Sequence, residues 1–149
     1  MDQPTDVNAA VLRIVNHQLY ELSKGIRPLS MFTTTEAGSA AVVTRLASKG
    51  IAHYVHKACP TKVNVIFGQP VAVATVRRFL TGPLCKLSPE HDFMLGILLG
   101  YDREKQCVRY LERAAAVAQA AAFTPEPAEL TVPSIWLDAA VEANPERLN

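Results

Sequence analysis

The sequence predicts a small α+β protein: a three-stranded antiparallel sheet in a β-α-β-β-α order, half of a ferredoxin-like fold, packed against about five helices. The 149 residues are 49% hydrophobic and 19% charged, a composition typical of one globular domain with its own core. Helix-spaced and alternating apolar patterns follow one another through residues 1–115. Glycine or proline separates most of these patterns. We take residues 1–115, which hold them, as the core domain.

The apolar spacing predicts eight elements in this part of the chain. Apolar residues at three- and four-residue steps predict helices at residues 8–24, 36–49, 71–80, 89–99 and 103 to about 122. Alternating or β-compatible residues predict strands at residues 29–34, 51–57 and 62–67. A short link joins the last two strands, so we expect them to form an antiparallel hairpin.

Capping residues support the helix boundaries in order along the chain. Gly25 ends the first helix, and Thr35 suits the N-cap of the second. Pro70 suits the first position of the third helix, Ser88 caps the fourth and Asp102 caps the fifth. The fourth helix is apolar on most sides, so we expect it to be central and buried.

The order of elements also predicts the arrangement of the sheet. A right-handed crossover places the strand at residues 62–67 between the other two. We expect helices to cover one face of this sheet. Its two open edges make dimerisation a natural way to complete the core, so we expect a homodimer.

Residues 116–149 predict a C-terminal extension. An alanine-rich stretch continues the last helix, and the prolines of residues 123–133 indicate an extended linker. Residues 134–143 predict a short helix with Trp136 and Leu137 on one face. An acidic, proline-rich linker before such a helix is typical of a docking peptide. The alternative is that Trp136 folds back on its own core or on its dimer mate.

The net charge of +1 is unevenly divided along the chain. Residues 116–149 hold five acids and one base, and residues 1–115 hold 14 bases and nine acids, so the tail is net −4 and the core net +5. Such a core suits an acidic protein partner, attracts its own tail, or carries ordinary solvated charge. It is too weakly basic for a nucleic-acid-binding protein.

The chain contains no apolar run of membrane-spanning length. Its N-terminus has no basic region followed by an apolar one, as a secretory signal would. We therefore expect a cytoplasmic protein with no membrane partner.

Two helical stripes are candidate partner-binding surfaces. The first combines three residues at helical steps with an arginine beyond the helix: His17, Tyr20, Lys24 and Arg27. The second follows Asp102 on the last helix: Gln106, Arg109, Tyr110 and Arg113. Tyrosine and arginine are enriched among interface anchors, and arginines suit an acidic partner. The alternatives are a polar flank covering the sheet edge and an internal network at the start of the last helix.

The cysteines and histidines predict no metal or cofactor site, and we name no catalytic residue. Cys59, Cys85 and Cys107 form no CxxC pair or Cys/His cluster. We expect Cys107 to be a buried small side chain, the alternative being a reactive thiol at Cys107 or Cys85. His53 and His56 lie three apart on a predicted strand and should point to opposite faces.

Several segments together resemble one bacterial family. They are HQLYE at residues 17–21, KGIR at 24–27, NVIFG at 64–68 and SPEHDFMLGILLGYDREKQCVRYL at 88–111. Over about residues 10–115 the chain is similar to the domain-of-unknown-function family numbered two thousand and twenty-three. The resemblance implies a small α+β fold, homodimers, an association with flavodoxin-like proteins, and no established activity. The residues after about 115 depart from the family.

These observations favour a non-catalytic, protein-binding accessory protein that engages an acidic partner, with a flavodoxin-type electron carrier as the first candidate. Two other hypotheses stay open. One is a small thiol-dependent or ligand-binding enzyme, which uses Cys107 or Cys85, or binds a ligand near Asn64 and Gly68. The other is a subunit that a larger complex recruits through the C-terminal tail.

Overall fold

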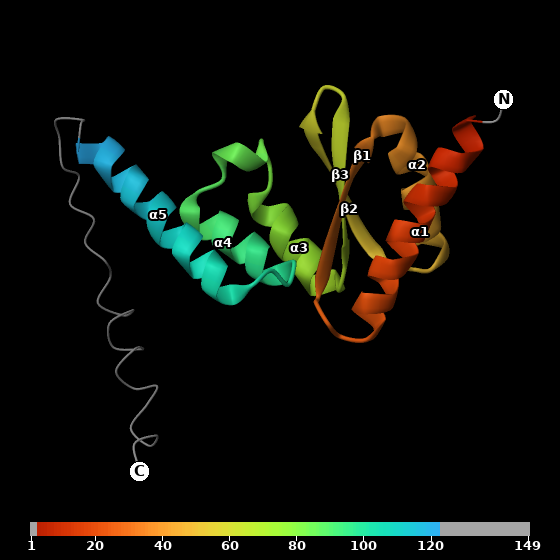
Figure 1. Ribbon diagram of the computed structural model, residues 1–149, viewed down its shortest axis with the longest axis horizontal. Coiled ribbons are helices and arrows are strands. Elements are labelled where there is room, and N and C mark those ends of the chain that lie inside the picture. Colours follow the sequence, from red (N-terminus) through yellow and green to blue (C-terminus); the bar gives the residue numbers. More distant parts are fainter. Residues whose placement is uncertain (1–2, 123–149) are drawn as a thin grey trace, which may run out of the picture. The chain divides into compact units, whose positions relative to one another are not determined.

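The computed structural model describes residues 3–122 and confirms the predicted order of helices and strands (Figure 1). The elements are α1 Gln3–Ser23, β1 Leu29–Thr35, α2 Glu36–Ser48, β2 Ala52–Cys59, β3 Lys62–Gly68, α3 Pro70–Phe79, the 3-10 turn η1 Leu84–Lys86, α4 Pro89–Leu98 and α5 Arg103–Ala122. Only η1 was not predicted. Residues up to Val117 form one compact unit, and the rest of α5 belongs to a second unit that lies mostly outside the described residues.

The three strands form one antiparallel sheet in the order β1-β3-β2, so the predicted central strand is confirmed. Phe32 of β1 and Val55 of β2 both pair with Val65 of β3. The β2–β3 hairpin contains a bulge between Lys57 and Cys59. Because β3 is central, all five residues from Val63 to Phe67 are buried.

Helices cover both faces of the sheet, where we expected cover on one face only. Val65 and Phe67 pack with residues of α1 and α2, whereas Ile66 packs with residues of α3 and α4. Figure 1 shows the sheet between α1 and α2 on one side and α3 on the other. The reason is the composition of β3, whose apolar side chains alternate to both faces and need burial on each.

A chain of hydrogen bonds, centred on the buried side chains of Asn64 and His56, crosses the sheet on the α3 face. Thr33 Oγ1 donates to Asn64 Oδ1 (2.7 Å), and Asn64 Nδ2 lies 3.2 Å from His56 Nδ1. His56 Nε2 then lies 2.8 Å from the carbonyl oxygen of Gly82, in the loop after α3. Since the Asn64 amide donates to Nδ1, the ring proton of His56 resides on Nε2 and is donated to Gly82. The strands and this loop are thereby connected.

Helix α4 is buried along one side only, so the prediction of a central, buried helix was wrong. Leu95, Gly96 and the adjoining Leu99 are buried, whereas Met94 is exposed. The sheet is small and α3 already covers much of this face, which leaves α4 an outer position against α3.

Helix α5 presents its polar stripe to α4 and its apolar residues to solvent. None of its side chains is buried, and Cys107, Val108 and Leu111 are exposed, so the prediction of a buried Cys107 was wrong. Gly96 of α4 lacks a Cβ, which leaves room for the Gln106 side chain against that helix. Along residues 3–122 we find no helix long and apolar enough to cross a membrane.

Candidate functional site

A groove lies between the start of β2 and helix α3. It has a volume of about 650 Å³ and opens to solvent. Its lining consists of the segment that leads into β2 and one side of α3: Gly50, Ile51, Ala52, His53, Pro70, Val73, Ala74, Arg77 and Arg78. We call this surface the β2–α3 groove.

Local sequence explains how the two walls of the groove form. The Ile51 backbone N–H donates to the Leu46 carbonyl at the end of α2 (3.0 Å), and this contact fixes the turn into β2. On the other wall, Pro70 occupies the first turn of α3, where the missing N–H is not needed. The buried positions of α3 are Ala72, Val73 and Val76, so helical geometry turns Ala74, Arg77 and Arg78 outward.

The rim of the groove is basic. The Arg77 guanidinium carbon lies 5.1 Å from the ring centroid of Tyr54, and the Tyr54 hydroxyl donates to the Leu80 carbonyl (2.9 Å). This stacking holds Arg77 at the sheet edge. Within residues 3–122 neither Arg77 nor Arg78 forms an ion pair. An apolar groove with two cations on its α3 wall, neither in an ion pair with a described residue, suits an acidic protein segment.

The second predicted surface, on α5, instead clamps α5 to α4 through Asp92. Arg109 Nε donates to Asp92 Oδ2 (2.7 Å), and Arg113 Nη1 lies 2.9 Å from Asp92 Oδ1. Arg113 also donates to the Leu87 carbonyl (3.0 Å), and the Tyr110 hydroxyl donates to a carboxylate oxygen of Glu90 (3.3 Å). The hydrogen bond from Arg109 lowers the pKa of Asp92, and Asp92 in turn raises the pKa of Arg109. The two arginines therefore already have an anionic partner.

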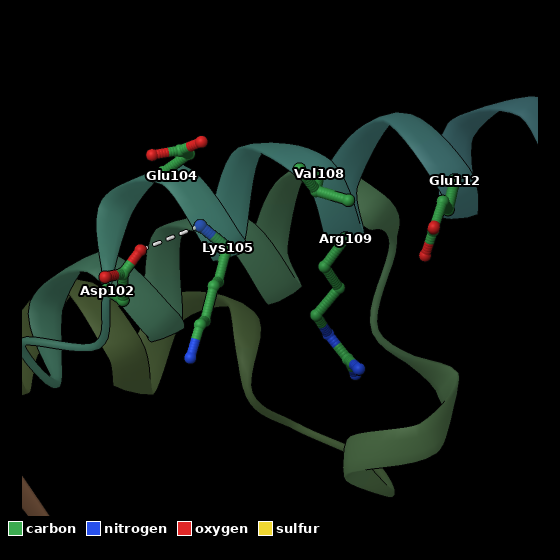
Figure 2. Close-up of a pocket in the computed structure, with 6 residues that line it drawn as sticks. All are labelled: Asp102, Glu104, Lys105, Val108, Arg109 and Glu112. Atoms are coloured by element: carbon green, nitrogen blue, oxygen red, sulfur yellow. Dashed lines mark hydrogen bonds between the residues drawn. The ribbon is translucent and has the colours of Figure 1, made fainter.

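The outer flank of this clamp carries charges of both signs. An open pocket of about 440 Å³ lies along α5. Among its lining residues, Lys105 and Arg109 point to the same side of the helix (Figure 2). The other lining residues are Asp102, Glu104, Val108 and Glu112. Asp102 acts as the expected cap, because it accepts a hydrogen bond from the Lys105 backbone N–H (2.9 Å). The mixture of charges makes this pocket less suited to an acidic partner than the β2–α3 groove.

The first predicted surface converges on Glu21, a residue that sequence reasoning did not single out. His17 Nε2 lies 3.3 Å from Glu21 Oε1, and Arg27 pairs with the other carboxylate oxygen. Arg27 also donates to the Leu99 carbonyl (3.4 Å), so it connects the loop after α1 to the end of α4. Tyr20 remains exposed, with the Lys24 ammonium 5.5 Å from its ring centroid. His17 and Arg27 therefore have a partner within the chain, and Tyr20 and Lys24 face outward.

All three cysteines are free and exposed. A hydrogen bond with the side chain of Thr61 lowers the pKa of the Cys59 thiol. Cys85 lines a separate pocket of about 340 Å³ that also contains Asp92 and Arg109. The sequence analysis named Cys85 and Cys107 as candidate thiols and did not single out Cys59. The available signal was Thr61, a hydroxyl residue two positions after Cys59.

The remaining sequence predictions have separate outcomes. His53 and His56 occupy positions of opposite parity on β2, as predicted. Asn64 is buried, and its two amide atoms bond to Thr33 and His56 within the sheet. No cluster of three metal-ligating side chains occurs among residues 3–122. Trp136 and Leu137 lie outside the described residues.

The sequence reasoning did not single out the basic rim as a binding surface. Arg77 and Arg78 are adjacent on an amphipathic helix, which was a visible signal. Their position beside β2 depends on the packing of α3 against β2, which their own spacing does not specify.

The chain matches the sequence model of a known protein family. The sequence model of a family described as "Protein of unknown function (DUF2023)" matches residues 13–113. The matched region includes both walls of the β2–α3 groove and the Asp92 clamp. No curated protein matches the chain.

Proposed function

Since the chain belongs to the DUF2023 family of proteins of unknown function, which brings no activity with it, we propose from the geometry that it is a protein-binding accessory protein for an acidic partner. The β2–α3 groove is the proposed docking surface. The observation that carries this proposal is the position of Arg77 and Arg78, which form no ion pair within residues 3–122, at the rim of an apolar groove. The positive net charge of residues 1–115 adds long-range attraction for an acidic protein.

A flavodoxin-type electron carrier is our first candidate for the partner. The resemblance identified in the sequence associates the family with flavodoxin-like proteins, and the basic groove supports an acidic partner of this kind. Exposed charge pairs are screened beyond about 8 Å at physiological ionic strength, so binding should weaken as salt is added. The expected location is cytoplasmic.

A charge-removal experiment tests this function. We expect the double variant Arg77→Gln/Arg78→Gln to bind the host's flavodoxin at least about tenfold more weakly at low salt, with a smaller salt dependence. The matched control is Arg103→Gln/Lys105→Gln, which removes two exposed cations from α5. Titration calorimetry measures both. Equal losses in the two variants would argue for non-specific attraction, and no loss in either would remove the groove as the docking surface.

The expected homodimer is a separate proposal, supported by the outward face of α5. Val108 and Leu111 on this face are 52% and 65% exposed, and Cys107 lies beside them. Small residues continue the stripe toward the end of α5, which would let two copies of the helix pack closely. Leu111→Glu should then halve the molar mass measured by light scattering. A wild-type protein that is monomeric at high concentration would remove this proposal.

Two other functions that the sequence analysis left open stay as proposals. In the first, a complex recruits the chain through Trp136 and Leu137, and deletion of residues 123–149 tests it by the loss of a co-purifying partner. In the second, the chain is a small thiol-dependent enzyme. The lowered pKa of Cys59 makes that thiol the first to test.

A further inference from the structure

The two edges of the sheet differ in how they are covered. On the β1 edge, the Gln18 side chain of α1 donates to the Met31 carbonyl (3.4 Å), and Met31 also lines the pocket beside α4 and α5. On the other side, β2 pairs with β3 alone among the described residues. An edge strand exposes alternate N–H and C=O groups that another strand can pair with. The β1 edge therefore already uses one of its backbone carbonyls in a hydrogen bond with α1. In the described part of the chain, the backbone groups of the β2 edge are available to pair with a further strand.

The first half of β2 also lacks the features that usually protect an edge strand. Lysine side chains, prolines and bulges discourage pairing with a further strand. In β2 the lysine and the bulge both lie in the second half, where Lys57 precedes the bulge. The segment Ala52–Val55 has no lysine, proline or bulge, and it begins at the β2–α3 groove. The unprotected half of the edge and the basic groove are therefore adjacent.

Side-chain alternation along β2 sets different requirements on its two faces. Tyr54 pairs with Ile66 on the α3 face, where Arg77 stacks on its ring. Val55 pairs with Val65 on the opposite face and is 42% exposed. A strand added beside β2 would place every second side chain near the arginines and the others near Val55. Acidic residues suit the first set, and apolar residues suit the second.

We propose that an extended segment of the partner adds to the sheet as a fourth strand along Ala52–Val55, with acidic and apolar side chains in alternation. This inference rests on the proposed function and specifies how the β2–α3 groove would recognise an acidic partner. Backbone pairing would supply affinity, and Arg77 and Arg78 would select acidic side chains on one face. A second copy of the chain is a poorer occupant, because pairing two β2 edges would bring two sets of the same arginines together.

Peptide binding to the full-length protein tests this mode. The probe is a ten-residue peptide that alternates glutamate and valine. Its controls are a block peptide of the same composition and two derivatives, N-methylated on every glutamate or on every valine. We expect the block peptide to bind at least about tenfold more weakly, and one N-methylated derivative to lose binding while the other keeps it. Only one alternate set of peptide N–H groups faces the edge, which predicts this asymmetry.

Amide hydrogen exchange locates the peptide. We expect the alternating peptide to slow exchange in Ala52–Val55 and to leave β1 unchanged, and we expect Arg77→Gln/Arg78→Gln to weaken peptide binding at least about tenfold. Equal binding of both N-methylated derivatives, protection on β1, or a peptide-free dimer that already protects β2 would each overturn strand addition.

The failure of strand addition can be distinguished from failure of the proposed function. If flavodoxin binding depends on Arg77 and Arg78 while both N-methylated peptides bind like the parent, strand addition is wrong and the docking surface stands. If the double variant binds flavodoxin and the peptide as well as the wild type does, the docking surface itself is wrong.

Discussion

Replacing Asp92 with Asn tests whether polar contacts hold α5 to the rest of the protein. Helix α5 has no buried side chain, so hydrophobic burial contributes less to its attachment than it does for the other helices. Asp92 bonds to Arg109 and lies 2.9 Å from Arg113, and both arginines belong to α5. Asn keeps the shape of the side chain but removes the charge and one acceptor.

The expected magnitude follows from the exposure of each partner. The side chain of Asp92 is 16% exposed, that of Arg113 26% and that of Arg109 57%. The Arg109 pair is largely screened by solvent and should contribute less than about 1 kcal/mol. The more shielded Arg113 pair should contribute roughly 1–2 kcal/mol. We therefore expect Asp92→Asn to lower the free energy of unfolding by about 2 kcal/mol at neutral pH.

Urea unfolding measures this loss, and amide exchange in α5 shows where it acts. The control is Glu112→Gln, which removes an exposed acid of α5 with no ion pair among the described residues. Because the native pKa of Asp92 is lowered, its stabilisation is present above its ordinary pKa of about 4 and is lost as the pH falls through the native value. The difference between wild type and variant should shrink there. A loss below about 0.5 kcal/mol at pH 7, with unchanged exchange in α5, would refute the clamp.

Three further predictions use the same measurements. Asn64→Ala should cost roughly 1–3 kcal/mol in urea unfolding, because it leaves Nδ1 of the buried His56 without its hydrogen-bond partner, and a cost under about 0.5 kcal/mol would contradict this hydrogen bond. Gly68→Ala should lower stability by about 3 kcal/mol, because Gly68 has φ +149° and a Cβ would collide with the Pro28 carbonyl oxygen; an unchanged melting temperature would contradict this geometry. In single-cysteine variants, Cys59 should be alkylated faster near pH 7 than a cysteine of ordinary pKa, and Thr61→Val should slow this alkylation. Equal alkylation rates with and without Thr61→Val would exclude the Thr61 hydrogen bond as the cause of the lowered pKa.

Most element boundaries were predictable because they depend on local signals. Thr35 caps α2 by accepting a hydrogen bond from the Gly38 N–H (3.1 Å), and Ser88 caps α4 by accepting one from the His91 N–H (3.1 Å). Such patterns act over a few residues, so the amino-acid order records them directly. The central position of β3 was predictable for a different reason: in a β-α-β-β order, a right-handed crossover places the third strand between the first two.

The orientation of α5 was not predictable from its own pattern. Its apolar residues Cys107, Val108 and Leu111 predict an inward face, and the structure turns them outward. The deciding contacts come from α4, where Asp92 attracts the arginines of α5. The candidate site was hidden for the same reason. Arg77 and Arg78 line a groove only because α3 packs beside β2. Both features depend on neighbours distant in sequence.

The hydrogen-bonded chain from Thr33 through Asn64 and His56 to Gly82 opposes slippage of the strands. A one-residue shift of an edge strand would send its inward side chains to the other face of the sheet. For β2, such a shift would break the contacts of His56 with Asn64 and with Gly82 at the same time. The strand that we propose as a template for an incoming segment is therefore fixed in register before any partner arrives.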